Sequence, residues 1–335
     1  MIGIGVVGYG YWGPNLVRNF HEVSDAKIVA VADLRDNRLE KLRKQYPAVK
    51  ALKDPLELLR DPAVDAVVVA TPVSTHFELA VEALRAGKHV LVEKPMTATS
   101  EQARRLIDEA EKRRRVLMVD HTFIYTPAVR KVRQLVAEKK LGDVLYYDSV
   151  RVNLGLFQHD VSVIWDLAVH DLSIMEYVVP ARPVCVSATA ISHVPRQPEN
   201  TAYVTVFFDA PVIGHVHVNW LAPVKIRRTL IGGSEKMVVY DDLEPSEKIK
   251  VYDKGITVTS NGESVYKLLI GYRAGDMWAP QLEMTEALRF EAEHFVGCVR
   301  DNKRPDTDGQ AGLSVVRLAE AATQSAVERG RPVEL

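Results

Sequence analysis

The chain has 335 residues, and this length predicts two domains. Hydrophobic residues make up 47% and charged residues 26% of the chain, a mixture that excludes a mainly disordered protein. The 43 Lys and Arg residues nearly balance the 44 Asp and Glu residues, and the net charge of -1 provides no overall basic field for nucleic acid or an anionic membrane.

Cysteine content and apolar runs bear on the compartment. Two cysteines, Cys185 and Cys298, exclude a disulfide framework and a Cys-rich zinc site, and they indicate a reducing environment. No apolar run reaches the roughly 18–20 residues that span a bilayer, and the glycine-interrupted N-terminus lacks the basic region of a secretory signal. We therefore expect a cytoplasmic protein.

Up to about residue 122, short apolar runs alternate with amphipathic segments. The runs are nearly continuous in Val, Ile, Ala and Leu, which is typical of strands buried on both faces of a parallel sheet. Strands are predicted at residues 2–8, 27–32, 64–70, 89–92 and 116–119, with helices at 14–22, 37–45, 74–86 and from 99 onward. Gly87 is suited to end the third helix, and Thr99 with Gln102 forms a capping-box pattern. This alternation predicts a doubly wound α/β domain over residues 1–122.

The second part of the chain has the texture of an antiparallel sheet. Strand-like runs follow one another through short turns, and apolar and polar residues alternate, as at Val204 and Val206. Strands are predicted at residues 144–153, 184–192, 202–208, 212–219, 228–231, 236–240 and 249–252, with helices at 128–139, 165–178, 280–299 and 310–329. Pro280 is predicted at the first position of its helix. We expect a second α/β domain over residues 123–335, built on a large open, mainly antiparallel sheet, whose last helix is able to pack back on the first domain.

A glycine-rich turn joins the first predicted strand to the first helix. Its sequence is Gly8-Tyr9-Gly10-Tyr11-Trp12-Gly13. Gly8 allows the tight turn, Gly10 lets the backbone approach a pyrophosphate, and Gly13 lets the helix pack close to the strand. The N–H groups and dipole at the helix N-terminus favour an anion. Strand, turn and helix in this order predict a dinucleotide site, to which Tyr11 and Trp12 also contribute.

An acid follows the second predicted strand. Asp33 lies twenty residues beyond Gly13, at the position where an acid binds the adenosine ribose hydroxyls. Its carboxylate repels a 2′-phosphate and therefore favours NAD over NADP. The neighbouring Arg35 is able to pair with such a phosphate, which leaves NADP as the less favoured alternative.

Two further strands end in residues suited to a ligand site. Thr71-Pro72 follows the strand predicted at 64–70, and Glu93-Lys94-Pro95 follows the strand predicted at 89–92. Ligands of open α/β sheets bind at the carboxyl ends of strands. The cofactor-binding candidates from this part of the chain are Thr71, Pro72, His76, Glu93 and Lys94. Lys94 is suited to donate to a substrate oxygen or to carry a proton, although a strand-end salt bridge explains the same residues.

A third signal lies in the helix predicted at 165–178. Asp166 and His170 are i and i+4, on one face of an α-helix, where the carboxylate is able to orient the imidazole. An amphipathic helix with a satisfied histidine accounts for the same pattern. A metal site formed by Asp166, His170 and a third ligand is an open alternative, but it lacks a clear partner motif, so no metal is predicted. His215 and His217 are interpreted as one face of a strand.

These signals together resemble the glucose–fructose oxidoreductase/inositol dehydrogenase (Gfo/Idh/MocA) family. The most specific stretch is Ala83-Leu84-Arg85-Ala86-Gly87-Lys88-His89-Val90-Leu91-Val92-Glu93-Lys94-Pro95. Residues 304–306 and the tail at 309–332 also fit, so the resemblance covers essentially the whole chain. It implies an N-terminal Rossmann domain that binds NAD. It also implies a C-terminal substrate-binding domain whose open sheet lines the substrate cleft and often mediates homodimers or homotetramers.

The resemblance implies roles by position. Lys94 is the expected catalytic lysine, and Asp166 and His170 match the family's Asp-x-x-x-His segment. Which of Lys94 and His170 carries the proton stays open. Residues 163–165 stand where many members have a Gly-rich run, so the substrate wall departs from the family pattern. The candidate substrate contacts are Arg151, Asn153 and Trp165.

Two local stretches narrow the expected substrate. Residues 10–20 and 165–174 resemble members that oxidise the C3 hydroxyl of UDP-N-acetylglucosamine or its uronic acid in bacterial surface-glycan pathways. We therefore expect an NAD-dependent oxidoreductase acting on a nucleotide sugar. A dehydrogenase or reductase of a free sugar or inositol is the alternative among enzymes. A non-catalytic NAD-binding sensor is the alternative of a different class, and Lys94, Asp166 and His170 argue against it.

Overall fold

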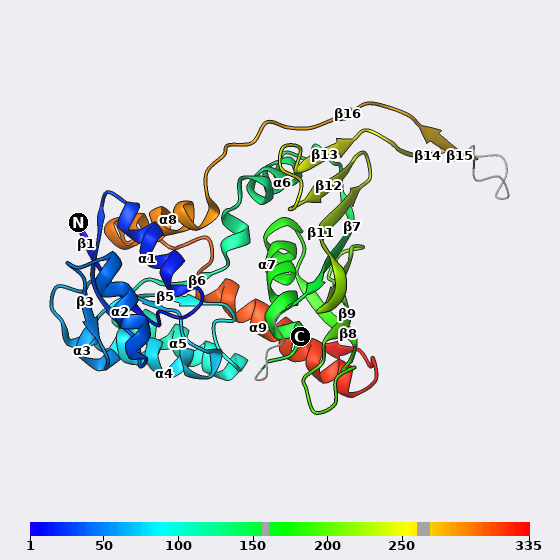
Figure 1. Cartoon of the computed structure of the whole chain (residues 1–335). Helices are drawn as coiled ribbons and strands as arrows, with labels where there is room; N and C mark the ends of the chain where they lie inside the picture. Colours follow the sequence, from blue (N-terminus) through cyan, green and yellow to red (C-terminus); the bar gives the residue numbers. More distant parts are fainter. Residues whose placement is uncertain (156–160, 260–268) are drawn as a thin grey trace. The chain divides into compact units, whose positions relative to one another are not determined.

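The computed structural model describes residues 1–155, 161–259 and 269–335 and divides into two compact units (Figure 1). Unit 1 comprises Met1–Thr126 and Thr285–Glu320, and unit 2 comprises Pro127–Met284 and Ala321–Leu335. The predicted second domain ran without interruption from 123 to 335. The structure differs in assigning a long C-terminal segment to unit 1.

Unit 1 contains a parallel sheet. Its described strands are β1 (Ile2–Val7), β2 (Ala26–Ala32), β3 (Lys50–Leu52), β4 (Ala66–Val69), β5 (His89–Glu93) and β6 (Leu117–Asp120). They lie in the order β3-β2-β1-β4-β5-β6, and each pairing is parallel. All of β4 is buried, as its unbroken run of Ala and Val predicts. This order confirms the predicted doubly wound fold.

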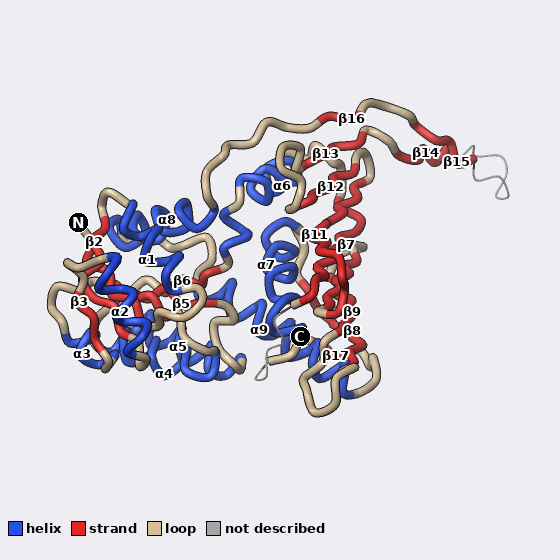
Figure 2. The backbone as a smooth tube through the Cα atoms, in the orientation of Figure 1, coloured by secondary structure: helices blue, strands red, loops and turns tan. Residues whose placement is uncertain are grey.

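Helices cover both faces of this sheet. They are α1 (Gly13–Glu22), α2 (Asp36–Gln45), α3 (Pro55–Arg60), α4 (His76–Arg85), α5 (Ser100–Arg113) and α8 (Ala287–Asp301), with the 3₁₀ turns η1 (Val73–Thr75) and η2 (Thr122–Tyr125). Figure 2 shows α1 and α8 along one side of the strands and α4 and α5 along the other. The Thr99 hydroxyl accepts from the N–H of Gln102 at 3.2 Å, which confirms one half of the predicted capping box. The other half is not formed, because Gln102 Oε1 has no hydrogen-bond partner among the described residues.

Unit 2 is built on a larger sheet. Its described strands are β7 (Val144–Leu154), β8 (Pro183–Ile191), β9 (Thr201–Phe208), β10 (Ile213–Asn219), β11 (Leu221–Gly233), β12 (Met237–Asp241), β13 (Ile249–Tyr252), β16 (Met277–Trp278) and β17 (Val333–Glu334). The order is β16-β13-β12-β11-β7-β10-β9-β8-β17. Among these described strands the pairing of β10 with β7 is parallel and the others are antiparallel, which confirms the predicted sheet type. A separate hairpin pairs β14 (Gly255–Thr259) with β15 (Leu269–Arg273).

A buried ion pair attaches a helix to one face of the larger sheet. Arg151 Nε on β7 donates to Asp171 Oδ2 at 2.5 Å, and the two side chains are 4% and 3% exposed. The hydroxyl of Tyr147, also on β7, donates to the carbonyl oxygen of Asp171 at 3.1 Å. Asp171 belongs to α7 (Val169–Val178), so α7 is fixed to the face that carries Tyr147 and Arg151. The remaining helices are α6 (Pro127–Ala137) and α9 (Gly309–Val327), the latter divided between the two units.

One predicted helix begins later than expected, and one edge strand was not predicted. The helix expected from Pro280 begins at Ala287, since burial starts only at Leu288 and the preceding residues are mostly exposed. A short segment without an apolar face to bury does not form a stable helix. The short edge strand β3 was not predicted, because its residues are exposed or half-buried and show no apolar run. Among the described residues, no helix is long and apolar enough to cross a membrane.

Candidate functional site

The glycine turn of unit 1 leaves no room for side chains at two positions. Gly8 has a φ of +100°, and a Cβ there would lie 2.3 Å from the carbonyl oxygen of Ala70. A Cβ on Gly13 would lie 2.2 Å from the carbonyl oxygen of Gly8. At Gly10 the nearest atom to such a Cβ is a guanidinium nitrogen of Arg35, at 3.4 Å. The turn therefore packs tightly at both ends and is open at Gly10, where a pyrophosphate would approach.

The two aromatic residues of the turn differ in their surroundings. Tyr11 is 83% exposed. Trp12 is half-buried, and its indole N–H donates to Asp120 Oδ2 at 3.2 Å. Asp120 is the last residue of β6 and is 1% exposed. The turn is therefore tied to the far strand of the sheet through Trp12.

Asp33 lies directly beyond β2 and receives several donors. Its Oδ2 accepts from the N–H of Tyr9 at 2.7 Å, and its Oδ1 accepts from the N–H and Nε of Arg35 at 2.9 and 3.2 Å. Burial alone would raise the pKa of Asp33, but these hydrogen bonds from Arg35 and Tyr9 hold it below its ordinary value. Asp33 is therefore a carboxylate, and the guanidinium of Arg35 offsets its charge at the edge of the turn.

The ends of β4 and β5 are joined by a buried histidine. His76, the first residue of α4, is 1% exposed, and its ring nitrogens lie 2.8 Å from the carbonyl oxygen of Thr71 and 2.9 Å from that of Pro95. Burial lowers the pKa of His76. His76, one of the predicted cofactor-binding residues, therefore holds together the loops that carry Thr71, Pro72 and Lys94.

A cluster of carboxyl groups lies beneath the end of β5. Glu93 and Asp120 are register partners on β5 and β6, and Glu291 comes from α8. Glu93 Oε2 accepts from the N–H of Lys94 at 3.2 Å. Burial, and then the charge of Asp120, raise the pKa values of both Glu93 and Glu291 well above the ordinary range.

These contacts form one connected set at the carboxyl edge of the parallel sheet. The predicted residues that the structure brings together in unit 1 are Gly8, Gly10, Trp12, Gly13, Asp33, Arg35, Thr71, His76, Glu93 and Lys94. The open backbone at Gly10, the donor-rich helix start and the carboxylate of Asp33 fit a nicotinamide dinucleotide.

In unit 2, the segment that carries Asp166 departs from the predicted α-helix. Ile164–Ala168 forms a π-helical turn, η3, and α7 follows it. A π turn has i→i+5 hydrogen bonds, so the turn that carries Asp166 is wider than the α-helical turn assumed for Asp166 and His170. Asp166 Oδ2 accepts from the indole N–H of the buried Trp220 at 3.2 Å. Asp166 and His170 are each half-buried, and π turns occur frequently at functional sites.

The candidate substrate contacts have different surroundings. Arg151 is 3% exposed and is engaged in the ion pair with Asp171, which indicates a structural role rather than a substrate contact. Asn153, two residues further along the same strand, is half-buried. Trp165 is half-buried, and its indole N–H donates to Thr323 Oγ1 at 3.0 Å.

The sequence interpretation missed Asp120 and Glu291. Asp120 could have been found, since it is an acid at a strand end in the same position as Asp33 and Glu93. Glu291 had no such signal, because it lies within a long C-terminal helix and its neighbours are known only from the fold. Among the described residues, no group of three or more His, Cys, Asp or Glu side chains is arranged to hold a metal ion.

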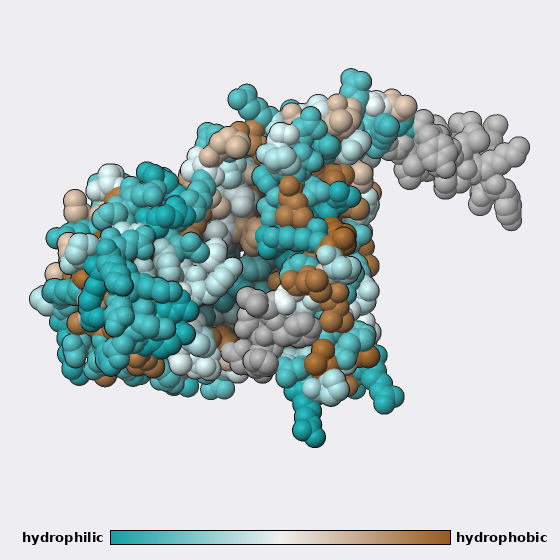
Figure 3. Space-filling model, in the orientation of Figure 1, coloured by the Kyte–Doolittle hydropathy of each residue, from teal (hydrophilic) through white to brown (hydrophobic). Residues whose placement is uncertain are grey.

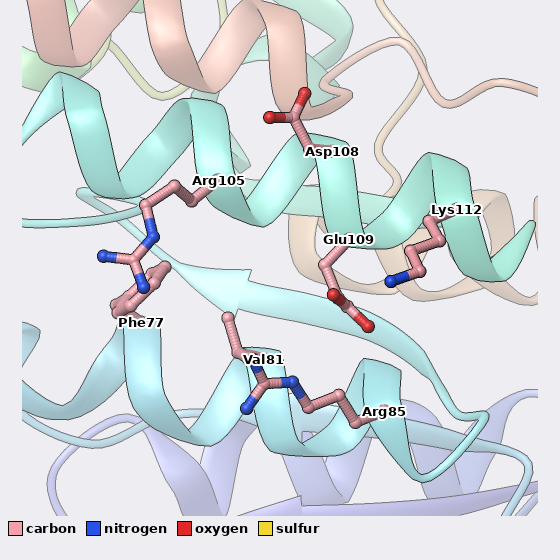
Figure 4. Close-up of a pocket in the computed structure, with 7 residues that line it drawn as sticks. All are labelled: Phe77, Val81, Arg85, Arg105, Asp108, Glu109 and Lys112. Carbon is pink, nitrogen blue, oxygen red and sulfur yellow. The ribbon is translucent and has the colours of Figure 1, made fainter.

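A surface groove between α4 and α5 is separate from this set. It is lined by Phe77, Val81, Arg85, Arg105, Asp108, Glu109 and Lys112 (Figure 4). The guanidinium carbon of Arg105 lies 4.9 Å from the ring centre of Phe77, and Arg113 pairs with Glu109. The charged side chains of this groove are those of two solvated helix faces, and none of them comes from the glycine turn.

Comparisons with known proteins give the family of the chain. The model of an oxidoreductase family with an NAD-binding Rossmann fold (GFO_IDH_MocA) matches residues 2–121, and the GFO/IDH/MocA C-terminal domain matches residues 129–239. The oxidoreductase YdgJ of Escherichia coli K12, described as uncharacterized, is 31% identical over 74% of this chain and 73% of its own.

Two relatives with named activities match over nearly the whole length. The scyllo-inositol 2-dehydrogenase (NAD(+)) of Bacillus subtilis 168 is 27% identical over 100% of this chain and 95% of its own. The UDP-N-acetylglucosamine 3-dehydrogenase of Acidithiobacillus ferrooxidans is 29% identical over 94% of both chains. Its solved structure, GnnA, superposes with a TM-score of 0.82 at 25% identity and covers 97% of both chains.

Fold and site together define a nicotinamide-dinucleotide-dependent oxidoreductase. The chain belongs to the GFO/IDH/MocA family, which confirms the resemblance of the sequence.

The raised pKa of Glu291 predicts a pH-dependent stability difference. The folded protein keeps a proton on Glu291 that the unfolded chain releases, so this contribution is lost as pH rises from the ordinary glutamate range toward the folded pKa. Glu291→Gln cannot ionise. We expect the free energy of unfolding of this variant, relative to that of wild type, to increase as the pH rises from about 5 to about 8. The increase is up to about 1.4 kcal/mol per pH unit.

Urea unfolding at the two pH values measures this gain. The control is Glu293→Gln on the same helix, where Glu293 is exposed and pairs with Arg289. A difference between Glu291→Gln and wild type that stays constant with pH would contradict the assignment.

Proposed function

We propose that this protein is an NAD-dependent dehydrogenase that oxidises a secondary hydroxyl group, C3 of a nucleotide sugar such as UDP-N-acetylglucosamine or its uronic acid. The observation that carries the dinucleotide part is the glycine turn held against Asp33 and Asp120 at the carboxyl edge of the sheet. The match to the UDP-N-acetylglucosamine 3-dehydrogenase over 94% of both chains supports the substrate part.

Lys94, Asp166 and His170 are the proposed catalytic residues. In the proposed reaction the ammonium of Lys94 donates a hydrogen bond to the substrate oxygen and stabilises negative charge as it develops there. The imidazole of His170 removes the hydroxyl proton, with Asp166 as its orienting carboxylate. NAD supplies the hydride acceptor when it is bound. The C–H and O–H bonds of the alcohol break, a carbonyl forms, and the proton is left on His170.

Oxidation of an inositol is the second candidate. It is favoured by the B. subtilis relative, whose 27% identity extends over 100% of this chain. A panel of UDP-N-acetylglucosamine, its uronic acid, free N-acetylglucosamine and inositols, read by nicotinamide absorbance, separates the candidates. The proposal includes a cytoplasmic location, with which the two buried free thiols Cys185 and Cys298 agree.

Asp33 predicts a preference for NAD. Its carboxylate would repel a 2′-phosphate, and Arg35 is already paired with it. We expect NAD to bind more tightly than NADP in calorimetric titrations. Asp33→Ser should reduce the difference between the two affinities, because it weakens the binding of NAD and releases Arg35 to pair with the 2′-phosphate of NADP. NADP binding as tight as NAD binding in the wild-type protein would refute this preference.

Lys94→Ala and His170→Asn are each predicted to lower turnover by roughly 10²–10⁴-fold, the usual range for a lost acid or base. The double variant should be only slightly slower than the slower single variant, because both groups act on one oxygen and its proton. The affinity for NAD should change little in His170→Asn. Rates are compared per NAD-binding-competent molecule, and wild-type turnover in His170→Asn would remove that residue from the mechanism.

We also propose a homodimer or homotetramer that buries the sheet face opposite α7. Tyr203, Phe207 and Ile213 on this face are 45%, 39% and 46% exposed, and apolar residues recur over the strands of unit 2 (Figure 3). Exposed apolar faces of this kind commonly form subunit interfaces. We expect wild type to sediment above the monomer mass at about micromolar concentration, and Ile213→Arg to sediment as a monomer with unchanged NAD affinity. A wild-type protein that sediments at the monomer mass contradicts the proposal.

A further inference from the structure

The carboxyl cluster of Glu93, Asp120 and Glu291 has no place in the reaction proposed above. Glu291 is 0% exposed and Asp120 is 1% exposed. Glu93 and Asp120 are adjacent in the register of β5 and β6, and Glu291 approaches both from α8. Three carboxyl groups in one buried place cannot all be ionised, because neighbouring like charges in a medium of low polarity repel strongly.

The hydrogen-bond donors are distributed unevenly over the cluster. Asp120 accepts from the indole N–H of Trp12 on one oxygen and from the hydroxyl of Thr122 on the other. Glu93 accepts from the N–H of Lys94 on Oε2. Within the described part of the chain, Glu93 Oε1 and both carboxyl oxygens of Glu291 are buried and receive no hydrogen bond of the kind that Asp120 receives. Asp120 therefore has the hydrogen-bond donors that an ionised carboxylate requires, whereas Glu291 does not.

We propose that Glu93 and Glu291 are neutral acids that share their protons with the Asp120 carboxylate, and that this cluster positions the glycine turn for NAD through Trp12. In this arrangement Asp120 is the acceptor for Trp12 and Thr122 and for the two acid protons. The cluster also holds the backbone N–H of Lys94 through Glu93. The positioning of Lys94 by Glu93 rests on the proposed function. The positioning of the glycine turn through Trp12 rests on NAD binding alone.

The position of Trp12 explains how the cluster acts on the cofactor. Trp12 directly precedes Gly13, where α1 begins and where the N–H groups that receive a pyrophosphate are located. A hydrogen bond to a buried carboxylate fixes the indole and with it the last residues of the turn. Ordering the turn in advance removes an entropy loss that would otherwise accompany binding. Glu291 is therefore a positioning residue that acts through Asp120 and Trp12.

The test is the dissociation constant of NAD in the full-length protein, measured by calorimetry without substrate. Glu291→Gln keeps a neutral hydrogen-bond donor and is expected to bind NAD within about twofold of wild type. Glu291→Leu removes the donor, and Trp12→Phe removes the indole N–H. Each is expected to weaken NAD about tenfold, which corresponds to one net hydrogen bond. The double variant Trp12→Phe/Glu291→Leu is expected to be no more than about twofold weaker than either single variant, because both changes break one chain of contacts.

Glu293→Leu on the same helix is the matched control, and its NAD affinity should equal that of wild type. A loss in Glu291→Gln as large as that in Glu291→Leu would overturn the proposal, since it would require an ionised Glu291. Wild-type affinity in Glu291→Leu, or additive losses in the double variant, would overturn it as well.

If Glu291→Leu does not fold, as judged by circular dichroism and thermal unfolding, the other two variants decide. The proposal is supported if Glu291→Gln binds NAD as tightly as wild type and Trp12→Phe binds it about tenfold more weakly. It is overturned if both variants lose NAD affinity to the same extent. Because no turnover is measured, failure of the proposed sugar oxidation leaves this test unaffected.

Discussion

A buried carboxylate must be given hydrogen-bond donors, and this requirement organises the carboxyl edge of the parallel sheet. Asp33 accepts a hydrogen bond from the N–H of Tyr9 at one end of the glycine turn, and Asp120 accepts one from the indole N–H of Trp12 at the other end. The turn is thus held at both ends by strands that are not neighbours of each other in the sheet. Its middle, at Gly10, is left open toward the side from which a dinucleotide would approach.

The same principle fixes the helix of unit 2 that carries His170. Arg151 and Asp171 form a buried pair, and removing one partner of such a pair commonly costs about 3–5 kcal/mol because the other charge is left without compensation. The pair therefore specifies where α7 lies on the sheet. It also explains why an arginine on a strand that leads toward the predicted catalytic helix is part of the scaffold, although its charge made it a reasonable candidate for binding substrate.

Elements with strong periodicity could be predicted from the sequence. The continuous apolar runs of unit 1 identify its buried strands, and the glycine turn, Asp33 and Lys94 follow from their places beside those strands. Glu291 could not be predicted in this way, because its role depends on its interaction with Asp120, a residue far away in the sequence. The start of α8 could not be predicted either. Pro280 favoured a helix start, but the residues that follow it have no apolar face to bury before Ala287.

The π turn at Ile164–Ala168 shows why the second half of the candidate site was harder to predict. A π turn holds one more residue than an α-helical turn, so the side chains around it are rotated from the positions that an α-helix would give them. Local sequence offers no clear signal for such an insertion, since Trp165, Leu167 and Ala168 are all compatible with an α-helix. The turn is in contact with residues from elsewhere in unit 2: the indole N–H of Trp220 donates to Asp166, and the indole N–H of Trp165 donates to the hydroxyl of Thr323. The orientation of the proposed acid–base residues is therefore a property of the packed unit, whereas their identity is a property of the sequence.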